Sequence, residues 1–151
     1  MVSREEIYDG IFQQLLKLQT NSQFVTVDRK LVNYSKVDAA SQPALYQLQS
    51  GESIKQVRGR PPEYSMSLEL FLYAWNADPT PGHYPSRILN PLLDLIFDVF
   101  AVPAGQSDQT FGIPSVQRIW IEGKVMIAEG VQAQKLTVGD RKRVAVVYRP
   151  G

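Results

Sequence analysis

The sequence predicts an α+β fold, a mainly antiparallel sheet with two α-helices packed on one face. Two segments of helical periodicity are set among runs of strand-forming residues. The order helix, strands, helix, hairpin, strand lacks the regular βαβ alternation of a parallel sheet. The chain has 151 residues, 44% of them hydrophobic, which suits a single core. We therefore expect residues 1–151 to form one domain.

The first helix is predicted from Arg4 to Leu18. Ser3 and Glu6 have the spacing of a capping box, in which each side chain accepts a hydrogen bond from the other residue's backbone amide. Apolar residues then recur at the spacing of one helical face. They are Ile7, Tyr8, Ile11, Phe12, Leu15 and Leu18. The polar residues 19–22 end the pattern.

Two short strands are predicted after this helix. The β-branched residues at 24–27 indicate the first, which residues 31–34 either continue or bulge before a polar turn. Apolar and polar residues alternate over 43–49, which is typical of a half-buried strand. We expect this second strand to end at residues 50–51, a serine followed by a glycine.

The next strand is predicted to be the longest. Residues 52–62 hold few apolar side chains and end in two prolines, so we expect a mobile hairpin tip there. Alternation then runs from Tyr64 to Trp75. The second face of this strand becomes aromatic at its far end, at Phe71, Tyr73 and Trp75, which indicates that this end is covered on both faces.

A second helix is predicted after a proline-rich loop at residues 76–85. Ser86 or Asn90 can cap it, with Pro91 tolerated in the first turn, and it should end before Pro103. Its apolar face is broad and consists of Leu89, Leu92, Leu93, Ile96, Val99 and Phe100.

The remaining elements are predicted to be mostly strands. A glycine-centred connector between two β-rich runs is typical of a hairpin. The predicted elements are a loop over 104–115, a hairpin of strands 116–121 and 125–128 joined around Gly123, a polar loop over 131–142, and a final strand over 144–148.

Composition excludes several classes of function. With 16 basic and 15 acidic residues the net charge is +1, so a global attraction to nucleic acid or to a membrane surface is not expected. The chain has no cysteine and one histidine, which excludes thiol chemistry and histidine clusters. We expect no cofactor and no metal. The acidic N-terminus and the lack of a long apolar run predict a soluble protein made in the cytoplasm.

Few residues suggest catalysis. Asp94 and Asp98 lie four residues apart on the predicted second helix, but no histidine or third carboxylate stands at ligand spacing, so a solvated helix face is the expected role. His83 lies in the proline-rich loop without a partner at motif spacing. The sequence contains no glycine-rich motif of the kind that binds phosphate, and it contains no nucleophile elbow. We therefore expect that the protein is not an enzyme, with no catalytic residues.

Basic residues concentrate at the C-terminal end. Residues 135–149 hold five of the 16 basic residues and one of the 15 acidic residues, so this segment carries +4 and the rest of the chain −3. Opposite charges on the two parts favour head-to-tail contact between copies. The candidate binding residues are Arg58, Arg60, Arg141, Lys142 and Arg143. Three roles stay open for them: a solvated loop, a rim of a protein interface, or a phosphate site.

Five stretches of packing and turn residues, in order along the chain, resemble the tail terminator (tail-completion) proteins of long-tailed bacteriophages. They are Arg29 to Tyr34, Gln42 to Leu48, Arg58 to Pro62, Leu89 to Asp94, and Trp120 to Gly123 before Glu129-Gly130. The resemblance implies a small α+β protomer that assembles into a ring, usually a hexamer. Such a ring caps the tail tube, ends its polymerisation and offers a surface to the head.

The partners implied by this resemblance are other copies of the chain, the major tail tube protein and the head-tail connector protein, with no membrane and no specific nucleic acid. The implied location is the head-proximal end of the virion tail, after assembly in the host cytoplasm. Two alternatives remain: a head-tail connector or tail-tube protein of the same fold, and a small nucleic-acid-binding module. The basic residues are expected to contribute to docking or ring contacts, so reversing the charges of Arg141, Lys142 and Arg143 should weaken assembly.

Overall fold

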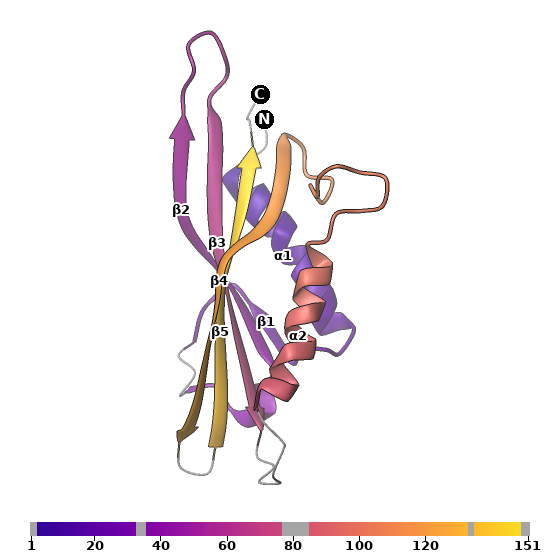
Figure 1. Ribbon diagram of the computed structural model, residues 1–151, viewed down its shortest axis with the longest axis vertical. Helices are drawn as coiled ribbons and strands as arrows, with labels where there is room; N and C mark the ends of the chain where they lie inside the picture. The colour runs from indigo at the N-terminus through magenta and orange to yellow at the C-terminus, as the bar shows by residue number, and fades with distance from the viewer. Residues whose placement is uncertain (1–2, 33–35, 77–84, 133–134, 149–151) are drawn as a thin grey trace.

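The computed structural model describes residues 3–32, 36–76, 85–132 and 135–148, which form five strands and two α-helices. The elements are α1 (Arg4–Thr20), β1 (Thr26–Asp28), a 3₁₀ turn (Ala39–Ser41), β2 (Ala44–Lys55), β3 (Glu63–Asn76), α2 (Pro85–Val99), β4 (Val116–Gln132) and β5 (Lys135–Tyr148). The sheet order is β1-β2-β3-β5-β4. Among the strands of these described residues, β1 and β2 alone pair in parallel. Both helices lie on one face of the sheet (Figure 1). The predicted α+β class is confirmed.

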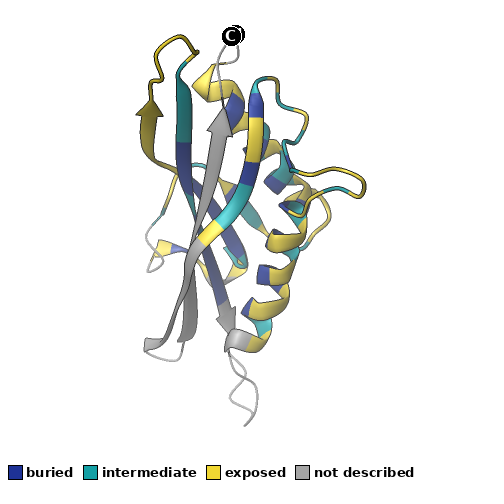
Figure 2. Ribbon diagram, turned by 45° about the horizontal axis from the view of Figure 1, so that its top comes forward, coloured by how far each residue is buried: buried dark blue, intermediate teal, exposed yellow. Residues whose placement is uncertain are grey.

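The main core lies between the helices and the sheet. Along β3, alternate side chains from Met66 to Ala74 point into it, as the two-residue period predicts. Figure 2 shows the buried residues concentrated where the helices face the strands. From the helices the fully buried side chains are Ile7, Tyr8, Ile11, Leu15, Leu89 and Ile96. Packing of this kind stabilises the helices, because short helices are marginal alone.

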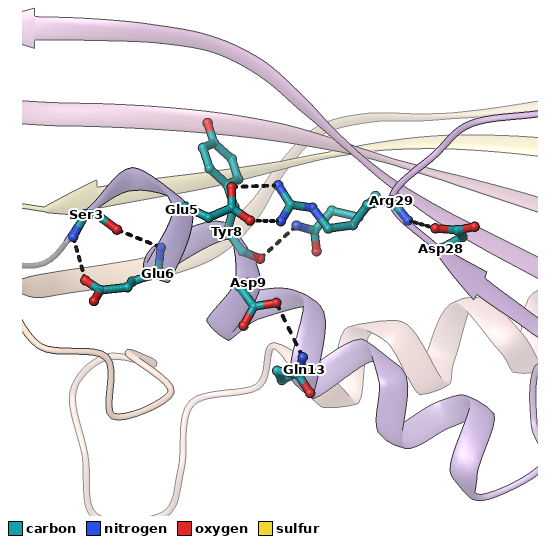
Figure 3. A network of polar contacts seen from close by, with 9 residues as sticks. Ser3, Glu5, Glu6, Tyr8, Asp9, Gln13, Asp28 and Arg29 are labelled. Carbon is teal, nitrogen blue, oxygen red and sulfur yellow. Dashed lines mark hydrogen bonds and ion pairs between the residues drawn. The ribbon is translucent and has the colours of Figure 1, made fainter.

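The N-terminal capping box forms as predicted, and α1 runs two residues further than expected. The Ser3 hydroxyl accepts from the Glu6 amide at 3.1 Å, and the Ser3 amide donates to the Glu6 carboxylate at 2.6 Å (Figure 3). Glu5 forms an ion pair with Arg29, which follows β1. The buried Gln47 amide donates to the Tyr8 carbonyl at 3.0 Å. These contacts fix α1 against the sheet.

A second, smaller cluster lies on the opposite face of the sheet. Tyr46 and Tyr73 pack there with ring centroids 5.6 Å apart, together with Val37 and Ala44. This confirms the predicted cover of the second face of β3 at Tyr73 and, in part, at Phe71, whereas the side chain of Trp75 lies outside the described part of the structure. Burial raises the pKa of Tyr46, and the nearby Asp28 carboxylate raises it further. Burial also raises the pKa of Tyr73, with a smaller contribution from Tyr46.

Stability is therefore expected to fall at alkaline pH. The folded-state pKa of Tyr46 lies above its unfolded value of about 10, so its contribution is fully present below that pH and is lost as the pH rises through the folded-state pKa. Urea unfolding at pH 8 and pH 11 should show a smaller loss of stability for Tyr46→Phe than for the wild type. Equal losses in the two proteins would contradict the assignment.

Two predictions about β2 and its surroundings are wrong. Residues 50–51 do not end the strand, because β2 continues to Lys55 through a bulge between Gln49 and Glu52. An irregularity of this kind absorbs a glycine without ending the pairing. The expected hairpin tip at 52–62 is therefore confined to 56–62. Residues 31–32 do not extend β1, and 33–35 lie outside the described residues.

The predicted hairpin around Gly123 is also wrong. Residues 116–132 form one long strand, β4, which pairs with β5 through an irregularity between Glu122 and Met126. The segment 131–142, predicted as a polar loop, belongs to β4 and β5 apart from residues 133–134, which the structure does not describe. The prediction of a loop rested on the polar composition of this segment. Polar composition alone does not exclude a strand, because antiparallel sheets can have one face in contact with solvent.

The second helix begins earlier than either predicted cap. It starts at Pro85, so Pro91 lies inside the helix instead of in its first turn. It ends at Val99, before Pro103 as predicted. Residues 104–115 form the expected loop, which touches β4 through one bridge between Gln109 and Ile119. Of the proline-rich loop, residues 77–84 and hence His83 lie outside the described residues.

Candidate assembly surface

Two of the five candidate basic residues lie at the end of a projecting hairpin. Arg58 and Arg60 are exposed in the turn 56–62 that joins β2 to β3. Gly59 takes a φ of +79° in this turn, and the Arg60 amide donates to the Val57 carbonyl at 3.0 Å. Figure 1 shows the turn extending past the rest of the sheet. We call residues 52–64 the arm.

The other three candidates lie elsewhere. Arg141, Lys142 and Arg143 are in the middle of β5, in register with Phe71, Leu70 and Glu69 of β3. Glu69 is five residues along β3 from Tyr64, the base of the arm, a separation of about 17 Å. The structure therefore does not gather the five basic residues into one rim.

The pairing register of β5 places Arg143 inside the sheet, between two neighbouring strands, and not in a loop. It is paired with Glu69 on β3 and with Glu122 on β4, so its backbone position lies between two acidic positions. Residues directly opposite one another on neighbouring strands share a face of the sheet, so these three positions lie on the same face. The register thus favours a role within the sheet for Arg143, which sequence reasoning missed because it placed this segment in a loop.

The arm carries apolar residues as well as basic ones. Ile54 and Val57 are 60% and 41% exposed, among the large hydrophobic side chains that the described residues leave to solvent. Lys55, Arg58 and Arg60 stand beside them. The sequence prediction treated this segment as a polar tip and did not single out the two apolar residues. Their position within a charged stretch could have identified them as exposed. An exposed apolar group with a basic surround is typical of a protein interface.

The base of the arm is held to α1. The Arg4 guanidinium pairs with Glu52 at 2.8 Å and lies 5.4 Å from the ring centroid of Tyr64. Arg4 is the first residue of the helix that the capping box begins. The arm is thus positioned by the helix N-terminus, while its turn stays exposed.

A second exposed apolar group lies at the C-terminal end of α2, and we call it the α2 patch. Phe97 and Val102 are 44% and 51% exposed. They line a hollow of about 270 Å³ together with Phe100 and part of β4. The sequence prediction did not include Phe97 in the apolar face of α2. A large apolar residue outside the buried face of a helix could have indicated an exposed contact surface there.

Charge around the α2 patch is mainly negative. Asp94 and Asp98 are exposed on α2, as the sequence predicted. The last turn of α2 holds no basic residue, so the negative end of its helix dipole is not offset within the helix. At the hollow, Arg118 stacks on Trp120 at 4.6 Å and lies 3.5 Å from Asp108. Its charge is therefore engaged by Asp108.

A shallow polar hollow of about 400 Å³ lies on the sheet between β2 and β4. Its lining combines small and acidic residues with one methionine and one tryptophan: Gly51, Glu52, Ser53, Ser65, Met66, Ser67, Trp120 and Glu122. Glu52 already pairs with Arg4, and Glu122 accepts a hydrogen bond from the Trp120 indole at 3.1 Å. Both acidic side chains thus have protein partners.

The described residues contain neither a cluster of metal ligands nor a helix that could span a membrane. Within residues 3–32, 36–76, 85–132 and 135–148, no group of three or more histidine, cysteine, aspartate or glutamate side chains could hold a metal ion. Over the same residues, no helix combines the length and apolar character needed to cross a bilayer.

No protein-family model matches the chain, and none of the curated proteins compared with it matches either. Solved structures do match the fold. One is a chain of a structure described as "Virion of native gene transfer agent (GTA) particle", with a TM-score of 0.49 and 9% sequence identity. The match covers 93% of this chain and 94% of that one. A likeness at this identity and TM-score does not identify the family of this chain.

Proposed function

We propose that this chain is a structural, non-catalytic protein of a phage-like virion and, more specifically, a tail terminator. Six copies close into a ring at the head-proximal end of the tail. The ring caps the tube of major tail protein, ends its polymerisation and presents a surface to the head-tail connector protein. The resemblance of five stretches of the sequence to tail terminators supports this proposal, which requires no cofactor.

The observation that carries the proposal is the pair of unlike edges of the sheet. β1 pairs with only residues 44–46 of β2, and no other described strand lies along residues 47–55 on that side. At the opposite edge stands β4, which has 17 residues and whose outer side is paired, within the described residues, only at Ile119 by the bridge to Gln109. Unpaired strand edges are sites for association with another chain.

Unlike edges favour a head-to-tail arrangement. When β4 of one copy meets the β2 side of the next, the contact joins two different surfaces, and every copy offers both. Such heterologous contacts generate a closed ring if the rotation per copy closes. A closed ring leaves no lateral edge for a further copy, so growth around the ring stops by itself. The loop 104–115 is left to contact other proteins above or below the ring.

Light scattering on the purified protein tests the ring. We expect a single species of about 102 kDa, six times 17.0 kDa, whose mass does not change with protein concentration. A tail-tube protein would instead grow without limit as concentration rises. Either unlimited growth or a protein that stays at 17.0 kDa even with tubes present argues against a terminator.

Electron microscopy of tails assembled with and without the protein tests the capping role. Tails grown with it should have uniform length and bear a ring at one end, because tube subunits can no longer add there. Tails of uniform, head-competent length in its absence would contradict the role.

A further inference from the structure

We propose that the arm of one copy docks on the α2 patch of the next copy in the ring, with Ile54 and Val57 seated against Phe97 and Val102. This inference rests on the proposed ring and assigns one of its contacts. The occupant of the α2 patch is thus a second copy of this chain.

Apolar exposure on both surfaces is the first argument. The arm and the α2 patch each expose two large apolar side chains, and the α2 patch adds a hollow of about 270 Å³. Burying these side chains against one another removes apolar surface from water on both copies. In Figure 1 the turn of the arm extends beyond the upper end of the sheet, whereas α2 packs beside the sheet lower down, so the two lie apart within one chain. A patch and a pocket at different places on one molecule produce a heterologous contact.

Charge complementarity is the second, independent argument. The arm presents Arg58 and Arg60, whereas α2 presents Asp94 and Asp98 near its C-terminal end. Asp98 lies in the last turn of α2, where a negative charge opposes the helix dipole, so it costs α2 some stability in the isolated chain. A basic arm placed there offsets both the aspartates and the dipole. The same pairing gives Asp94 and Asp98 a role beyond a solvated face.

The position of the two surfaces agrees with the proposed edge contact. The arm belongs to β2 and β3, and along residues 47–55 no described strand pairs with the edge of β2 that faces away from β3. The hollow of the α2 patch is bounded by residues 118–121 of β4, the opposite edge. When β4 of one copy approaches the β2 side of the next, the two surfaces belong to the two copies that meet.

Cross-linking tests the contact directly, because the chain has no cysteine of its own. Proteins carrying Val57→Cys and Val102→Cys are mixed and treated with a short bismaleimide. In the control mixture, Val25→Cys replaces Val102→Cys, because Val25 lies near β1 and is also 51% exposed. We expect heterodimers from the first mixture at least tenfold in excess of the control. Equal yields in the two mixtures overturn the proposal.

Charge exchange provides a second test. Arg58→Glu/Arg60→Glu should weaken self-association about tenfold, and combining it with Asp94→Lys/Asp98→Lys should restore most of the loss. Failure of the combined variant to recover, with its fold intact by circular dichroism, overturns the docking. A wild type that still forms the closed ring while both tests fail leaves the proposed function standing. Loss of the ring itself in the wild type would instead reject that function.

Discussion

Replacing Leu70 by alanine is expected to lower the free energy of unfolding by about 2–5 kcal/mol. Leu70 is 1% exposed and lies in the middle of β3, the central strand of the sheet, within the main core. Truncation removes buried methyl groups and leaves a cavity that strands fixed on both sides cannot close. Urea unfolding at neutral pH measures the loss as a shift in the midpoint at an unchanged slope.

The matched control is Ile54→Ala, which removes a similar side chain from the exposed arm. Its effect on stability should stay within about 0.5 kcal/mol, because Ile54 is 60% exposed. The two variants thus separate the folding role of the core from the assembly role of the arm. Similar losses in the two would mean that the arm is packed in the folded protein and is not a free docking element.

The alternation along β3 and the helical period of α1 were predictable because both patterns are local and each has one clear buried face. Leu68 and Leu70 are buried, while the intervening Glu69 is not, as a two-residue period requires. The capping box is also local, since Ser3 and Glu6 need only each other. These elements could be derived from the sequence alone, and with them the α+β class.

The errors share a physical cause. Gly51 and Gly123 were taken as turns, yet each lies in a strand at or near a break in pairing register. A glycine marks a bend in either case, and only the partner strand decides whether the chain reverses or continues. That partner is distant in sequence, so the lengths of β2, β4 and β5 could not be predicted locally.

The candidate site was predicted only in part for the same reason. Arg58 and Arg60 lie in an exposed turn as predicted, because the composition of 52–62 already indicated one. Arg141 to Arg143 were placed in a loop, and the structure puts them in β5, where register sets Arg143 opposite Glu69. A basic run cannot by itself reveal whether a neighbouring strand supplies acidic positions. Phe97 and Val102 come together only when α2 and the following loop are folded.

Shortening the arm is expected to have the largest effect on assembly. Lys55 and Glu63 are paired across the hairpin, so residues 56–62 can be replaced by Asn-Gly, which favours a two-residue turn between paired strands. This variant lacks Val57, Arg58 and Arg60. Because residues 56–61 are exposed, the free energy of unfolding should change by less than about 1 kcal/mol.

Self-association of the shortened protein should weaken by about a hundredfold, since it loses an apolar anchor together with its basic surround. Light scattering should then show mainly the shortened chain as a monomer, at concentrations where the wild type forms its ring. A control replaces 56–62 by seven glycine and serine residues, which keeps the length of the turn but removes the same side chains. If the contact depends on chemistry, both variants fail to assemble; if reach alone matters, only the short one fails. A ring that persists in both would show that the sheet edges close it without the arm.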